Sequence, residues 1–121
     1  MENLYYKVKL YLEANGKTES EIGPSEKKDN VVLQNDGSGD FIKKWSVSGV
    51  NKPTDSQLNT LASNATKEHN NAVIRNTRKN SYGSIGDQLD LLYKDIVANK
   101  LDTTGEWAKK IKAVKDANPK E

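Results

Sequence analysis

YGSIGDQLD at residues 82–90 joins a long polar segment to a strongly amphipathic one. A tyrosine, two glycines and a serine form a short hinge, and Ser84 is placed to cap a helix whose first turn carries Asp87. The hinge holds no reactive group. We therefore expect it to set the angle between two helices in a structural or assembly protein, and the sequence gives no support for an enzyme.

The residues after the hinge predict two helices. Apolar side chains recur there at spacings of three and four, which is the helical period. The first helix carries Ile85, Leu89, Leu92 and Ile96. The second follows a capping-box pattern at residues 103–106 and carries Trp107, Ile111 and Val114. Because about five residues join them, we expect an antiparallel helical hairpin.

The residues before the hinge predict one long helix. Thr54 and Gln57 fit a capping box, and a narrow stripe of mostly small residues runs from Leu58 to Val73. No proline or glycine interrupts residues 55–81, which permits a helix of up to about 40 Å. A polar helix of that length is rarely stable alone, so we expect neighbouring chains or a partner groove to support it.

Alternating polar and apolar residues predict strands in the first fifty positions. Over residues 4–12, one side holds Leu4, Tyr6, Val8, Leu10 and Leu12, with Tyr5, Lys7, Lys9 and Tyr11 opposite. Residues 18–30 are polar and predict a loop. A short strand is expected at residues 31–33 and another at residues 41–50, with Phe41 and Trp45 on one face and Ile42 on the other. We expect a small antiparallel meander.

The predicted fold class is therefore α+β. A β-meander domain at residues 1–52 precedes a long linking helix at residues 53–81 and a C-terminal helical hairpin at residues 82–121. Only 34% of the 121 residues are apolar and 30% are charged, so the core must be small. We expect a partner, or self-association, to cover part of the apolar surface.

Charge and composition narrow the classes of partner. The net charge of +2 is far below the basic excess of dedicated nucleic-acid binders. The absence of cysteine excludes disulfides and thiolate metal sites. No apolar run approaches membrane-spanning length. We therefore expect a protein that is made in the host cytoplasm and binds no membrane, and the charge does not favour nucleic acid as its main partner.

No set of residues predicts catalysis. His69 is the only histidine, no Gly-x-Ser-x-Gly elbow accompanies it, and it is best interpreted as a helix-packing residue. Asp87 and Asp90 lie one turn apart, as a cation site or an acid–base pair would require. However, Asp87 at a helix N-terminus is already favoured by the helix dipole. We predict no catalytic, cofactor-binding or metal-binding residue.

Aromatic and basic residues are the candidates for protein contacts, because tyrosine and tryptophan are enriched at interfaces. Arg75, Arg78 and Lys79 form a basic cluster that suits an acidic partner surface or phosphates. The apolar candidates are equally expected in an ordinary core. The predicted interaction residues are Tyr5, Tyr11, Arg75, Arg78, Tyr82, Gln88, Leu89, Leu92, Tyr93 and Trp107.

The second half of the chain resembles a known family. Arg75, then residues 82–90, Tyr93, and a lysine-rich helix ending at Pro119–Lys120 resemble the C-terminal module of small tailed-phage tail or tail-fibre assembly proteins. Their recurrent string is Tyr-Pro-Ser-x-x-Asp-Gln-Leu-Asp. Gly83 stands where that family usually has proline, so the hinge is expected to be looser. Residues 45–58 also resemble the family's linker, and the likeness covers roughly residues 41–120.

The resemblance implies a phage context and a non-enzymatic role. The expected function is a tail-associated structural or adaptor protein of the virion. Its partners would be other phage tail or fibre components, with the chain forming a homo-oligomer or binding an oligomeric partner. One alternative is a tail or tail-fibre assembly chaperone that is absent from the mature particle. Another is a phage nucleic-acid-binding accessory protein.

Overall fold

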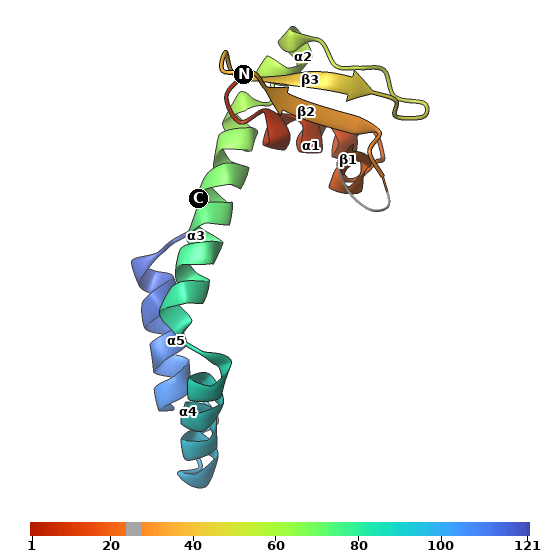
Figure 1. Cartoon of the computed structure of the whole chain (residues 1–121). Helices are drawn as coiled ribbons and strands as arrows, with labels where there is room; N and C mark the ends of the chain where they lie inside the picture. Colours follow the sequence, from red (N-terminus) through yellow and green to blue (C-terminus); the bar gives the residue numbers. More distant parts are fainter. Residues whose placement is uncertain (24–27) are drawn as a thin grey trace. The chain divides into compact units, whose positions relative to one another are not determined.

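The structure, a computed structural model, describes residues 1–23 and 28–121 (Figure 1). Contacts divide the chain into two compact units, Met1–His69 and Asn70–Glu121. A small sheet lies in the first unit, and the long helix and the C-terminal helices follow it in the chain. The predicted α+β class is confirmed.

The first unit combines helices with a three-stranded sheet of order β1-β2-β3. Its elements are α1 (Leu4–Ala14), the 3₁₀ turn η1 (Glu19–Glu21), β1 (Ile22–Gly23), β2 (Val31–Asn35), β3 (Asp40–Trp45) and α2 (Asp55–Asn59). β1 is parallel to β2, and β2 is antiparallel to β3, so the sheet is mixed and not wholly antiparallel as predicted. Within the loop predicted at residues 18–30, η1 and β1 form, and residues 24–27 lie outside the described part.

The strand predicted at residues 4–12 is wrong, because this segment forms helix α1. Leu4, Val8 and Leu12 are all buried, and their spacing of four satisfies both the strand period and the helical period. The two periods differ at other positions. Lys7, assigned to the polar strand face, is buried, whereas Leu10, assigned to the apolar face, is only half-buried.

A β-bulge in β3 overturns the predicted strand faces. Leu33 pairs with Ile42 and Val32 pairs with Lys44, so Lys43 has no partner on β2. An extra residue reverses the inward and outward positions that follow it. Ile42 and Trp45 therefore both pack against the core, although the sequence predicted opposite faces for them.

The core of the first unit lies where α1 meets the sheet and the residues that follow it. Its buried members are Leu4, Val8, Leu12, Val31, Val47 and Leu58. Half-buried Met1, Ile22, Leu33, Ile42, Trp45 and Val50 pack around them. This unit therefore possesses a closed hydrophobic centre of its own.

The helix predicted to run unbroken through residues 55–81 is interrupted. The capping box forms as predicted, with the Gln57 backbone N–H donating to Thr54 Oγ1 at 3.1 Å and the Thr54 N–H donating to Gln57 Oε1 at 2.9 Å. α2 then ends at Asn59, where the Thr60 hydroxyl donates to the Gln57 carbonyl at 2.6 Å. The long helix α3 begins at Ala62 and ends at Tyr82, 21 residues in all.

The second unit begins within α3 and continues into α4 (Ile85–Val97) and α5 (Glu106–Ala117). Gly83 takes a φ of 83° between α3 and α4, a left-handed conformation that glycine adopts without strain. Ser84 caps α4 as predicted, since its hydroxyl accepts from the Asp87 N–H at 3.1 Å. α4 packs against α5 in the predicted hairpin.

We predict that Leu12→Ala lowers the free energy of unfolding of the first unit by about 3 kcal/mol, because it leaves a cavity in the core. Leu10→Ala is the matched control and should cost about 1 kcal/mol, since Leu10 is only half-buried in α1. Urea unfolding, followed by Trp45 fluorescence in a Trp107→Phe background, measures both values. Equal losses would contradict the helix and favour a strand, on which both leucines share one face.

Candidate interaction surface

A buried carboxylate on α4 joins this helix to the start of α5. Asp95 on α4 is 4% exposed, and its two oxygens accept from the Glu106 N–H and the Trp107 N–H, each at 2.9 Å. The first N–H groups of a helix have no partner within that helix and favour a negative charge nearby. Asp95 therefore caps α5 from the neighbouring helix.

The capping box predicted at residues 103–106 is wrong. The N-cap of α5 is Gly105, which has no side chain to accept a hydrogen bond. A Cβ atom there would overlap the Lys100 carbonyl oxygen and lie 2.6 Å from Asp95 Oδ2, so only glycine fits. One sequence signal for this arrangement existed. Asp95 lies in the last turn of α4, where the helix dipole makes a negative charge unfavourable. Such a charge therefore suggests a hydrogen-bond donor from outside the helix.

Arg78 holds the opposite end of α5. Its Nε donates to the Asn118 carbonyl at 2.8 Å and its Nη2 to the Lys115 carbonyl at 3.4 Å. The last carbonyls of a helix lack the regular helical donors, so a side-chain cation is favourable there. Asn71 continues the attachment, because its side chain both accepts from the Glu121 N–H at 2.9 Å and donates to the Glu121 backbone oxygen at 3.3 Å. Arg78, predicted as a contact residue, thus attaches the end of α5 to α3.

The rest of the predicted basic cluster is exposed. Arg75 and Lys79 are open to solvent, whereas Arg78 is half-buried. Lys79 lines a hollow of about 590 Å³ at the hinge, together with Tyr82 and Gln88. Gln88 Nε2 donates to the Gly83 carbonyl at 3.1 Å, so this predicted contact residue also supports the hinge.

The two tyrosines predicted as contacts on α1 are bonded within the first unit. The Tyr5 hydroxyl donates to Glu19 Oε2 at 3.0 Å, and burial together with this bond raises the pKa of Tyr5 to about 12. The Tyr11 hydroxyl donates to the Asn51 carbonyl at 2.8 Å, and its ring lies 5.9 Å from the ring of Trp45. Tyr5 as a whole is nevertheless 41% exposed and remains open to a partner.

His69, the only histidine, packs its ring edge-on against Tyr6, with 5.6 Å between the ring centroids. Nearby, Lys9 Nζ on α1 lies 3.2 Å from Glu68 Oε2 on α3. The lysine has a raised pKa because it donates a hydrogen bond to this carboxylate. Both contacts join α1 to the start of α3. His69 therefore packs between helices as predicted, but its side chain is exposed and not partly buried.

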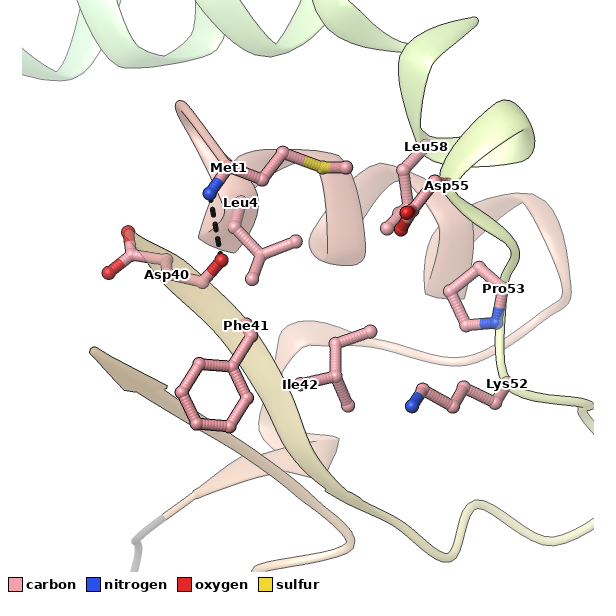
Figure 2. A pocket seen from close by; sticks show the side chains of 9 residues that line it. All are labelled: Met1, Leu4, Asp40, Phe41, Ile42, Lys52, Pro53, Asp55 and Leu58. Atoms are coloured by element: carbon pink, nitrogen blue, oxygen red, sulfur yellow. Dashed lines mark hydrogen bonds between the residues drawn. The ribbon is translucent and has the colours of Figure 1, made fainter. Parts of the chain in front are cut away.

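A hollow of about 420 Å³ opens at the edge of the first unit's core (Figure 2). Its lining is largely apolar and includes Leu4, Ile42 and Leu58, and the side chains of Lys52 and Asp55 lie around it. The Met1 ammonium donates to the Asp40 carbonyl at 2.8 Å beside it. Such a lining suits an apolar side chain or the end of an apolar ligand.

Among the described residues, most of the exposed large apolar side chains lie on α4. We call Ile85, Leu89, Tyr93 and Ile96 the α4 stripe; their exposed fractions are 70%, 58%, 63% and 52%. Val97 extends it on α4 and is equally open, and Leu101 in the loop after α4 is also exposed. Spacings of four and three place the stripe on one side of the helix. The second unit, all of which the structure describes, has no buried apolar side chain to match it.

The predicted contact residues of the hairpin fall into two groups. Leu89 and Tyr93 belong to the α4 stripe. Leu92 and Trp107 are half-buried and line a hollow of about 290 Å³ between α4 and α5. The structure therefore does not bring all four into one surface, and the stripe is the part that remains open.

Asp87 and Asp90 are both exposed in the first half of α4. Asp90 forms an ion pair with Lys94, with 3.3 Å between Oδ2 and Nζ. Within residues 1–23 and 28–121, no group of three or more His, Cys, Asp or Glu side chains is placed to hold a metal ion. In the same ranges, no helix combines the length and apolar character needed to cross a membrane.

Comparison of the chain with protein-family models, with curated proteins and with solved structures finds no match.

We predict that Asp95→Ala lowers the free energy of unfolding of the second unit by about 2–3 kcal/mol, because two N–H groups lose a charged acceptor. Asp116→Ala, which removes an exposed carboxylate from α5, is the control and should change it by less than about 0.5 kcal/mol. Urea unfolding followed by Trp107 fluorescence in a Trp45→Phe background measures both. Equal effects would show that Asp95 is no cap.

Proposed function

We propose that this chain is a tail-associated structural or adaptor protein of a tailed bacteriophage, which acts in the virion through protein–protein contacts. The observation that carries the proposal is the α4 stripe. It is an ordered row of large apolar side chains, and it lies on a unit that has no buried apolar side chain. A surface of this kind is a contact surface.

The energetics favour a covered stripe. Full burial of one such side chain stabilises by about 1.5–3 kcal/mol, so the stripe represents a large unused contribution in a small unit. The hinge and the Asp95 cap hold α4 through hydrogen bonds, and these leave the stripe free. Polar contacts thus set the geometry of the hairpin, and an apolar face is presented for binding.

The phage context is supported by the roles of the residues that carry the family resemblance. Ser84 caps α4, and Gln88 bonds to the Gly83 carbonyl, so both support the hinge. Leu89 has no such role and lies open on the stripe. A short string that specifies both a hinge and an exposed contact residue fits a docking module. The proposed partners are other phage tail or fibre components, and the proposed role involves no catalysis.

Of the two alternatives, the assembly chaperone would use the same stripe. The nucleic-acid-binding alternative has less support, because Arg78 is bonded to the end of α5 and is only half-exposed. The cluster then presents only Arg75 and Lys79, which are fewer cations than phosphate tracking requires.

We expect mass spectrometry to find the chain in purified particles of the phage that encodes it, at a fixed ratio to the tail proteins. Its presence in infected-cell lysates but not in particles would contradict the structural role and support the chaperone.

A phage carrying Leu89→Glu should yield fewer infectious particles, because a charge replaces an apolar contact. Ala113→Glu adds the same charge at an exposed position of α5 and should leave the yield unchanged.

A further inference from the structure

We propose that two copies of this chain associate through the α4 stripe, with their α4 helices side by side and antiparallel. The inference concerns this surface alone, and it holds or fails whether or not the chain belongs to a virion. Two patterns on α4 support this inference: the order of the apolar residues and the order of the charges beside them.

The apolar pattern is complementary to itself when reversed. An antiparallel pair centred at Leu91 sets Ile85 of one copy against Val97 of the other, and Leu89 against Tyr93. All four side chains are more than half exposed in the single chain. Each therefore meets an apolar partner, and each contact occurs twice because a twofold axis relates the copies.

The charge pattern is also complementary to itself when reversed. Asp90 and Lys94 lie beside the stripe on one edge of α4, where they pair at 3.3 Å. A twofold axis perpendicular to both helices brings this edge of one copy next to the same edge of the other. Asp90 of each copy then lies close to Lys94 of the other, which forms two intermolecular pairs. The opposed helix dipoles also favour this direction.

A parallel pair lacks these contacts. Its twofold axis runs along the helices and sets the Asp90–Lys94 edge against the opposite edge of the other α4. Gln88 and Leu92 lie on that edge, next to the side that α5 covers. No acid there faces Lys94, and no base faces Asp90. The antiparallel arrangement is therefore the one that the surface favours.

The surface has the composition of an interface centre. A stable dimer buries roughly 800 Å² on each partner, with an apolar centre and a polar rim. Ile85, Leu89, Tyr93, Ile96 and Val97 supply the apolar centre. Asp90 and Lys94, each about two-thirds exposed, supply the rim.

The first test is the molar mass of the full chain by sedimentation equilibrium over micromolar to millimolar concentrations. We expect a monomer–dimer equilibrium that Leu89→Glu weakens by about 100-fold, because a carboxylate would have to be buried at the interface. Ala113→Glu should leave it unchanged, and circular dichroism should show equal helix content in all three proteins. A monomer at every concentration would overturn the proposal and leave the stripe to a different partner.

The second test reverses the charges. Asp90→Lys and Lys94→Asp should each weaken dimerisation by about tenfold, because both intermolecular pairs become repulsive. An equimolar mixture of the two variants should recover the original affinity. In the mixed dimer, one chain carries lysine at both positions and the other carries aspartate at both, so every lysine faces an aspartate. Failure of the mixture to recover would overturn the antiparallel arrangement, even if a dimer forms.

The third test uses introduced cysteines, since the chain has none of its own. Under mild oxidation, a mixture of Ile85→Cys and Val97→Cys chains, one of them tagged, should form mainly the mixed disulfide. Each variant alone should not crosslink, because in an antiparallel pair its two cysteines lie about 18 Å apart along the helices. Efficient crosslinking of Ile85→Cys alone would show a parallel pair and overturn the proposal.

Discussion

The two hydrogen bonds that Asp95 accepts determine which side of α4 is exposed in the C-terminal hairpin. A carboxylate in the last turn of α4 is unfavourable for its own helix and favourable for the start of α5, and the geometry at Gly105 lets the two approach. Once Asp95 faces α5, the rotation of α4 about its axis is settled. Ile85, Leu89, Tyr93 and Ile96 then lie on a side that α5 does not cover.

The two units solve the problem of a small core in different ways. The first unit closes a hydrophobic centre between α1 and its sheet, with Leu12 and Val31 fully buried. The second unit buries a carboxylate instead, and side-chain bonds to backbone groups hold its helix ends. Polar contacts hold the fold of the second unit, so its exposed apolar side chains are available to bind a partner.

Sequence patterns predicted most of the helices after Pro53, but not the break between α2 and α3 or the cap of α5. Capping signals at Thr54 and Ser84 and the apolar spacing after the hinge depend on local geometry, and the structure confirms them. The first helix was missed because Leu4, Val8 and Leu12 fit two periods at once. The faces of β3 were missed because a bulge cannot be read from alternation, which presumes an unbroken register.

The candidate site was predictable only in part. Leu89 and Tyr93 followed from the apolar period, but periodicity alone does not show which side of a helix a neighbour covers. That choice depends on Asp95 and Gly105, ten residues apart in the sequence and in contact in space. Arg78 illustrates the same limit, since its pairing with the Asn118 carbonyl joins residues 40 positions apart.

The bulge at Lys43 also has a consequence for how copies can join. β3 forms one edge of the sheet, and a regular edge strand offers unpaired backbone groups to any further strand. An irregular edge with two adjacent lysines resists that kind of growth, which has no natural end. A helix face, in contrast, offers no further binding surface once one partner covers it. The bulge and the lysines thus disfavour fibril growth at β3, whereas the assembly we propose through α4 would be finite and closed.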